Sequence, residues 1–192
     1  MKHILQENFS TQKVEKYSEE FKSNNPYPHI VIDNFLLKNN ANKALDNFTI
    51  NDNWTNVSLV NNYKKYQLTD KKCMDKNCNE ILEELNSREF IDILIKITGI
   101  NNIFLDLSLD GGGLQQVLNG GLLNVHTDFN SHITETTWKR VLNILIYLNH
   151  NWIDEYNGKL ELWDEKVEKK VKSISPIFNR CVIFKTDKKS FH

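Results

Sequence analysis

The chain has 192 residues, of which 40% are hydrophobic and 26% are charged, and its formal net charge is -1. This length and composition are ordinary for one globular domain, and the near-neutral charge gives no reason to expect nucleic acid or a membrane surface as a partner. No apolar run approaches the roughly 20 residues needed to cross a bilayer, and the N-terminal stretch turns polar too early for a secretory signal.

The front part of the chain, residues 1–101, has a mixed pattern of helices and strands. In chain order we expect a helix at 11–22, a strand at 29–33, a helix at 38–48, a strand at 54–60, and helices at 79–85 and 87–98. Ser10 is placed to cap the first of these helices, and Gly99 is placed to end the last. This half is therefore predicted to be α/β in character.

The back part, residues 102–192, consists of short apolar runs separated by turn residues. We expect strands at 103–107, 114–118, 122–126, 141–148, 160–163, 171–174 and 181–185. Glycine clusters at 111–113 and 120–121 separate the first three of these strands. Short strands between turns favour a jelly roll or barrel over a parallel α/β sheet. No linker or repeat interrupts the chain, so we expect a single domain over 1–192.

The most informative residues are His126 and Asp128. Two side chains that are two positions apart point to the same face of a strand. A third ligand from a distant strand, for which His192 is the candidate, would complete two histidines and one carboxylate, the set used by non-heme Fe(II) oxygenases. On their own, His126 and Asp128 favour an ordinary hydrogen-bonded pair over a metal site, so the metal interpretation depends on the motifs around them.

These surrounding motifs occur in a recognisable order and carry a family resemblance. They comprise the strand before His126, the segment Arg140–Asn149 that ends in Tyr-Leu-Asn, Trp152, the hairpin Tyr156–Trp163, the strand Phe178–Phe184, and Ser190-Phe191-His192. The chain resembles the prolyl 4-hydroxylase-like branch of the Fe(II)- and 2-oxoglutarate-dependent dioxygenases. The stretch Pro26–Leu36 is similar to the opening of a bacterial and phage-type subgroup of that family.

The resemblance implies a fold and an activity. The expected fold is α+β with a mainly β core: a double-stranded β-helix, or jelly roll, with the N-terminal helices packed outside. His126, Asp128 and His192 would hold Fe(II), leaving positions for 2-oxoglutarate and O2; ascorbate is a further candidate cofactor. The expected reaction hydroxylates an unactivated C–H bond of a small-molecule or peptidyl substrate and releases succinate and CO2.

Four further site residues follow from the resemblance. Tyr147 matches a strand tyrosine that can donate a hydrogen bond to the distal carboxylate of 2-oxoglutarate. Alternation places Asn143 on the same inward face, as a polar contact in the pocket. Arg140 is a candidate substrate contact, with a salt bridge at the strand end as the alternative. His132 lies in the loop after Asp128, which borders substrate in this family, with a plain loop histidine as its alternative.

Two departures from the family pattern concern the later part of the chain. The glycine pair of the hairpin is replaced by Asn157-Gly158, which still tolerates a left-handed backbone. The family also places Arg or Lys about one strand after its second histidine, to pair with the 2-oxoglutarate carboxylate. No residue follows His192, so our hypothesis is a truncated, inactive form that lacks the C-terminal strands. The competing hypothesis is a natural end with a weakened cosubstrate site.

The cysteines and the alternative function complete the expectations. Cys73, Cys78 and Cys181 cannot all pair, and the first two have the wrong spacing for a CxxC site, so we expect reduced thiols in a cytoplasmic protein. The alternative to a dioxygenase is a non-catalytic metal- or ligand-binding jelly roll derived from the same family.

Overall fold

The structure is a computed structural model that describes residues 1–46, 48–58, 62–104, 106, 108–109, 111–128, 131–132 and 134–192. Its helices are η1 (Gln6–Phe9), α1 (Thr11–Ser23), α2 (Lys38–Asp46), α3 (Lys76–Leu85), α4 (Arg88–Thr98) and η2 (Asp154–Tyr156), where η marks a 3-10 helix. Its strands are β1 (His29–Ile32), β2 (Thr55–Asn56), β3 (Asn62–Leu68), β4 (Leu114–Leu123), β5 (Leu142–Tyr147), β6 (Leu160–Trp163), β7 (Lys170–Ile174) and β8 (Arg180–Lys185).

The helix ends follow local capping chemistry. Ser87 accepts a hydrogen bond from the Phe90 N–H at the start of α4, and Gly99 ends it in the left-handed conformation with φ 73°. α3 begins at Lys76, before the predicted residue 79, because Asp75 caps it. The prediction for Ser10 was wrong in one respect: α1 starts directly after it, but the Ser10 side chain makes no capping hydrogen bond.

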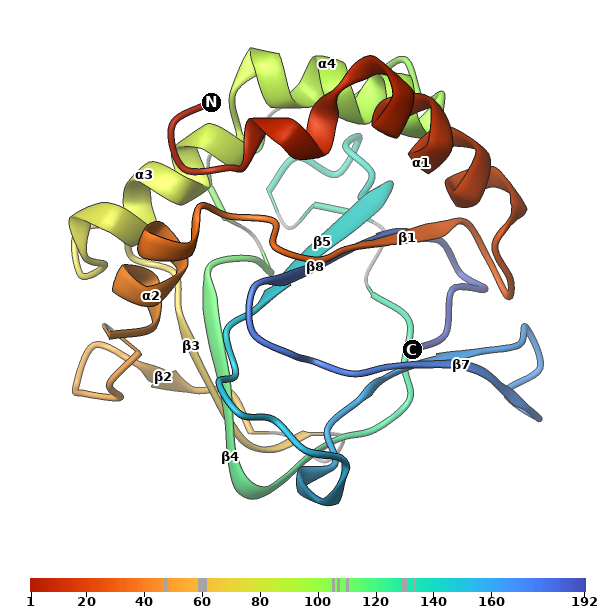
Figure 1. Cartoon of the computed structure of the whole chain (residues 1–192). Coiled ribbons are helices and arrows are strands. Elements are labelled where there is room, and N and C mark those ends of the chain that lie inside the picture. The colour runs from red at the N-terminus through yellow and green to blue at the C-terminus, as the bar shows by residue number, and fades with distance from the viewer. Residues whose placement is uncertain are drawn as a thin grey trace.

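The central sheet has the strand order β1-β8-β5, with all pairs antiparallel. Alternate residues of its strands face opposite sides. Ile183 of β8 and Ile144 of β5 pack into the larger core, under the helices that cover this side in Figure 1. Val182 and Tyr147 face the other way, into a second group that we call the site-side cluster, whose buried members are Tyr27, Leu162, Ile174, Val182 and Phe184. This sheet therefore lies between the helical layer on one face and the site-side cluster on the other.

A second sheet has the order β2-β3-β4 and lies beside the first. β4 runs through the glycine pair at 120–121, so the strands predicted separately at 114–118 and 122–126 form one strand that ends at Leu123. The register against β3 shifts between Tyr63 and Lys65, so this irregularity accommodates the additional residues of β4 between Val117 and Leu122. Of the predicted strand 103–107, the described residues lie outside any strand, and Leu105 and Leu107 fall outside the described part.

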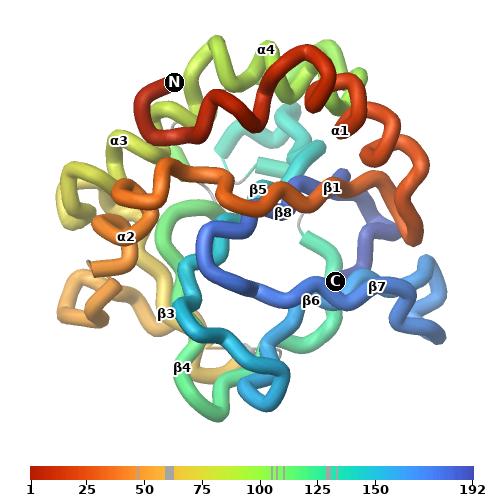
Figure 2. The backbone as a smooth tube through the Cα atoms, viewed as in Figure 1, coloured from red at the N-terminus to blue at the C-terminus, as the bar shows by residue number. Residues whose placement is uncertain are grey.

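β6 and β7 form a two-stranded hairpin next to the C-terminus (Figure 2). The Trp163 N–H at the end of β6 donates to the Phe191 carbonyl at 3.0 Å, which ties the last residues to this hairpin. Among the described helices, none has the length and apolarity that a membrane span requires.

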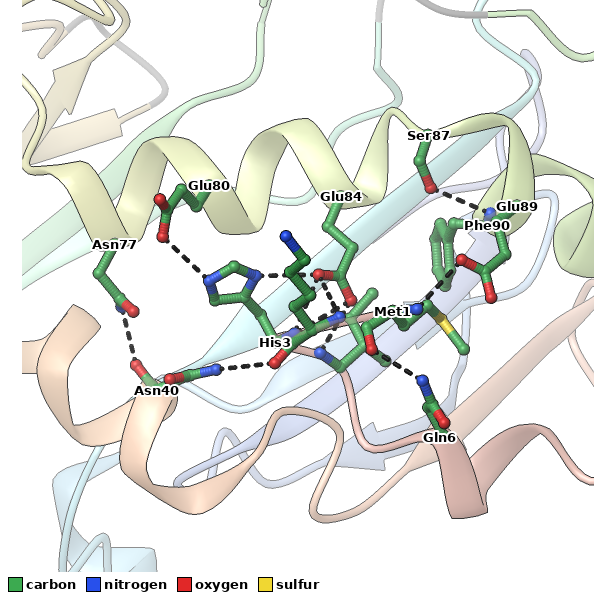
Figure 3. Close-up of polar contacts among 12 residues, drawn as sticks. Met1, His3, Gln6, Asn40, Asn77, Glu80, Glu84, Ser87, Glu89 and Phe90 are labelled. Atoms are coloured by element: carbon green, nitrogen blue, oxygen red, sulfur yellow. Dashed lines mark hydrogen bonds and ion pairs between the residues drawn. The ribbon is translucent and has the colours of Figure 1, made fainter.

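The first residues of the chain are held against α3 and α4 (Figure 3). The Glu84 carboxylate accepts hydrogen bonds from the backbone N–H groups of Lys2 at 2.8 Å, His3 at 2.9 Å and Ile4 at 3.0 Å. The His3 ring lies between Glu84 and Glu80, at 2.9 and 3.1 Å. One acidic side chain thus satisfies three consecutive N–H groups and docks the N-terminal segment.

Candidate metal centre

His126, Asp128 and His192 come together although Asp128 and His192 are 64 positions apart in the sequence. One ligand atom from each residue lies within 4.8 Å of the other two, and each residue is partly buried. His126 lies three residues beyond the end of β4, so the prediction that a regular strand carries both His126 and Asp128 was wrong. The two histidines are instead aligned by backbone pairing with each other, because His126 and His192 each donate an N–H to the other's carbonyl at 2.9 Å.

Both histidine rings present the same nitrogen to the centre. Nδ1 of His126 lies 2.8 Å from the Asn124 carbonyl, and Nδ1 of His192 lies 3.1 Å from the Ser190 carbonyl. A carbonyl oxygen can only accept, so each Nδ1 carries the proton. The lone pair is therefore on Nε2, which is the arrangement of a metal-binding histidine oriented by a backbone carbonyl.

The Asp128 carboxylate is oriented through one of its two oxygens. Asn143 Nδ2 donates to Oδ2 at 2.7 Å, and Arg140 Nη1 lies 3.5 Å from the same oxygen. The other oxygen, Oδ1, lies 4.0 Å from Nε2 of His126. One oxygen is therefore held by the protein while the other faces a histidine lone pair, and two imidazoles with one carboxylate fit a divalent transition metal such as Fe(II).

The environment of His192 favours a neutral imidazole. Burial lowers its pKa, while the Asp128 charge and the hydrogen bond to Ser190 act in the opposite direction. The positive charge of Lys65 lowers the pKa further. The neutral ring is the form that coordinates a metal.

The predicted face of β5 is observed. Asn143, Leu145 and Tyr147 alternate toward the site side of the sheet, and Asn143 reaches Asp128. Burial raises the pKa of Tyr147, so its hydroxyl keeps its proton and can donate. That hydroxyl makes no hydrogen bond within the described residues. The Phe184 ring, also in the site-side cluster, lies 4.9 Å from the ring of His192.

His132 is not brought into the triad. Its Nε2 lies 3.0 Å from Ser108 Oγ and 3.5 Å from Asp106 Oδ2, and the N–H groups of Thr134 and Glu135 point at its Nδ1. His132 therefore orders its own loop, which agrees with the alternative of a plain loop histidine and not with a metal ligand. Asn130 and Ile133 of that loop lie outside the described residues.

Two other histidines lie outside the triad and have structural contacts of their own. His150 is exposed and stacks on Phe178 with ring centroids 3.7 Å apart. His29 is buried in β1, and its Nδ1 lies 2.8 Å from the Tyr27 carbonyl.

Two residues near the triad were not predicted from the sequence. The Tyr27 hydroxyl donates to the Phe191 carbonyl at 2.9 Å and so fixes the residue before His192. The sequence feature that could have identified Tyr27 is its position between Pro26 and Pro28, in the stretch that carries the family resemblance. Lys65 lies on β3, a strand that the sequence pattern did not indicate, and its charge acts on both Asp128 and His192.

Comparisons with known proteins agree with this arrangement. A family model described as the 2OG-Fe(II) oxygenase superfamily matches residues 112–192, which include the whole triad. The chain is similar to the solved structure of a prolyl hydroxylase from Trichoplax adhaerens in complex with a hypoxia inducible factor oxygen degradation domain peptide fragment. The identity is 21% and the TM-score 0.64, and the match covers 98% of this chain and 88% of that one.

A second solved structure, described under prolyl 4-hydroxylases from Phytophthora capsici, is similar at 15% identity with a TM-score of 0.55. That match covers 94% of this chain and 56% of the other, so this chain spans little more than half of that relative. No curated protein sequence matches the chain. At these identities the two solved structures establish a shared fold, and the segment that the family model matches contains the triad.

Proposed function

Because the chain resembles the prolyl hydroxylase-like 2OG-Fe(II) oxygenases in both its C-terminal sequence and its fold, we propose that it is an Fe(II)- and 2-oxoglutarate-dependent dioxygenase. The proposed reaction hydroxylates an unactivated C–H bond. The observation that carries the proposal is the convergence of the ligand atoms of His126, Asp128 and His192 within 4.8 Å.

In this proposal, Nε2 of His126, Oδ1 of Asp128 and Nε2 of His192 hold the iron. When bound, Fe(II) with 2-oxoglutarate and O2 supplies an oxidative decarboxylation that releases succinate and CO2 and is coupled to hydroxylation. The chain itself contributes orientation. The carbonyls of Asn124 and Ser190 fix the two rings, and three protein ligands leave room for the cosubstrates.

Other side chains shape the surroundings of the triad. Asn143 and Arg140 orient the carboxylate of Asp128 through its Oδ2. The Tyr147 hydroxyl, which keeps its proton, is proposed to donate to a carboxylate of 2-oxoglutarate. Phe184 and its neighbours in the site-side cluster exclude water from the back of His192. Arg140 is also the residue that we propose to meet the substrate.

A peptidyl substrate is our first choice of substrate class. The support is that the Trichoplax adhaerens prolyl hydroxylase is described in complex with a peptide fragment. We further propose a single domain with the double-stranded β-helix arrangement. A cytoplasmic location fits Cys73, Cys78 and Cys181, all of which are free thiols.

The test is a metal and turnover assay on the full chain. Purified protein is loaded anaerobically with Fe(II) and 2-oxoglutarate, exposed to O2, and assayed for succinate. We expect succinate only when all three components are present. Iron binding with no succinate above the protein-free background would instead support the non-catalytic metal-binding alternative.

A further inference from the structure

The turn between η2 and β6 contains Asn157-Gly158, which stands where the family pattern has a glycine pair. Both residues are exposed, and Gly158 has φ 75° with open space where a side chain would stand. When glycine follows asparagine, no side chain shields the glycine nitrogen from the side-chain amide of the asparagine. The geometry of this turn therefore decides how readily that nitrogen and that amide react with each other.

The backbone of Asn157 has a conformation that brings the two reacting groups together. Its φ is 56° and its ψ is -156°, a combination that residues with a side chain rarely adopt. Because the substituents of Cα are spaced evenly around the Cα–C bond, this ψ brings the Gly158 nitrogen close to the eclipsed position over Cβ of Asn157. In a strand or an α-helix, the same nitrogen is turned well away from Cβ. Closure of a five-membered ring between this nitrogen and Cγ thus needs only a small further rotation.

Hydrogen bonds hold the Asn157 backbone in this conformation. Its N–H donates to the Asp154 carbonyl at 3.1 Å, and its carbonyl accepts from Trp152 Nε1 at 3.0 Å. Since the carbonyl points toward the indole, the Gly158 N–H points the other way, and within the described residues it makes no hydrogen bond. The side-chain Nδ2 of Asn157 has only a long contact of 3.3 Å, to the Glu155 carbonyl. The glycine N–H is therefore open to solvent, and the side chain is held only weakly.

The chain contains a second Asn-Gly pair, Asn119-Gly120, with a different backbone. Asn119 is also exposed, but it lies within β4 and has an ordinary negative φ. Its carbonyl accepts from Lys64 Nζ at 3.0 Å. The two pairs share their chemistry and their exposure and differ in backbone conformation, so Asn119 is an internal control for Asn157.

We infer that Asn157 is a site of spontaneous deamidation through a succinimide. Hydroxide removes the proton of the Gly158 N–H, and the nitrogen forms a bond to Cγ of Asn157. The Cγ–Nδ2 bond then breaks, and the leaving nitrogen takes a proton from water and departs as ammonia. Water opens the ring at either carbonyl, which gives an aspartyl or isoaspartyl residue with one new carboxylate. No oxidant or reductant takes part, and the inference does not depend on the function proposed for the metal centre.

The test compares the two asparagines in the same sample of the full chain. Native protein is incubated at mildly alkaline pH, and peptide mapping by mass spectrometry at intervals measures the replacement of NH2 by OH at each site. We expect Asn157 to react at least about fivefold faster than Asn119, because it already has the backbone conformation that other asparagines reach only at a cost. In the chain unfolded in urea, this conformational difference is lost, so the ratio of the two rates should fall toward one.

Two variants complete the test. Asn157→Gly removes the reacting amide and tolerates the positive φ, so modification of this turn should disappear while Asn119 reacts at an unchanged rate. Trp152→Phe removes the indole N–H that holds the Asn157 carbonyl, so the ratio of the two native rates should fall. A native rate at Asn157 no higher than at Asn119, or a ratio equally high in urea, overturns the inference. An unchanged or higher ratio in Trp152→Phe overturns the role of the hydrogen bond from Trp152.

Discussion

His126 and His192 exchange two backbone hydrogen bonds, each N–H donating to the other's carbonyl at 2.9 Å, and their rings lie 4.5 Å apart. This is the pairing of directly opposed residues on antiparallel strands. It places two side chains on one face at a separation that the backbone sets. The third candidate ligand therefore reaches the site through main-chain geometry, and the Tyr27 hydroxyl reinforces the position by binding the carbonyl of Phe191.

The triad should control metal binding. We expect His126→Ala and Asp128→Ala each to lower Mn(II) affinity by more than about 100-fold, because each removes a ligand rather than a supporting contact. Titration of the full chain with Mn(II), followed by electron paramagnetic resonance, measures the change. His150→Ala is the control, since His150 is exposed and stacks on Phe178. Unchanged Mn(II) affinity in either ligand variant would refute the assignment.

Asn143 should raise the metal affinity of the site without being a ligand itself. Asn143→Leu removes the 2.7 Å hydrogen bond to Asp128 Oδ2 and leaves that carboxylate less firmly oriented. Metal affinity should fall about 10- to 100-fold. Asn149→Leu is the matched control, because it removes a bond of the same length, to the Pro176 carbonyl. If both asparagine variants weaken Mn(II) equally, the effect is one of folding and not of orientation.

Substitutions on the two faces of β8 should differ in their effect on metal binding while having similar effects on stability. Ile183 and Phe184 are both fully buried neighbours, but Ile183 packs under the helices and Phe184 contacts the His192 ring. Ile183→Val and Phe184→Leu should each reduce the free energy of unfolding by on the order of 1 kcal/mol. Only Phe184→Leu should also weaken Mn(II), which urea denaturation and metal titration on the same samples will check. Equal metal affinities in the two variants would contradict a role for Phe184 in positioning His192.

Glu84 should make docking of the N-terminal segment pH-dependent. Burial raises the pKa of Glu84, but the hydrogen bonds from Ile4, Lys2 and His3 outweigh this effect and hold the pKa below its usual value of 4.5. Because the folded pKa is the lower one, Glu84 stabilises the protein above pH 4.5, and this contribution is lost as the pH falls through the folded value. Glu84→Gln should cost about 1 kcal/mol at pH 7, allowing for partial exposure.

The pH dependence distinguishes this interpretation from a simple packing effect. The stability difference between wild type and Glu84→Gln should shrink as the pH falls below 4.5, in urea denaturation series at several pH values. Glu83→Gln, an exposed neighbour on the same helix, should show no such trend. A constant difference across the pH range would rule out the ionised carboxylate as the cause.

Features governed by neighbouring residues were predictable from the sequence. The end of α4 at Gly99 and its start after Ser87 follow from capping, which involves residues at most a few positions apart. The shared face of Asn143 and Tyr147 follows from the two-residue period of a strand. The start of α3 at Lys76 also follows from a local cap, because the Asp75 side chain accepts hydrogen bonds from the N–H groups of Asn77 and Cys78.

Features governed by distant pairing were not predictable. β3 has a polar sequence with Lys64 and Lys65 at its centre, so no apolar alternation marked it as a strand. It forms because β4 provides its hydrogen-bond partners, about fifty residues later in the chain. The continuity of β4 through Gly120-Gly121 has the same origin, since the shifted register against β3 absorbs residues that locally resemble a turn.

The sequence by itself determined which side chains can bind a metal and in what order they occur, because donor chemistry belongs to the residue type. The tertiary structure decided that one atom each of His126, Asp128 and His192 lies within 4.8 Å of the others, and which ring nitrogens remain available. It also brought Lys65 into electrostatic interaction with Asp128 and His192. Those relations depend on backbone pairing and packing between segments far apart in the chain, which no local pattern encodes.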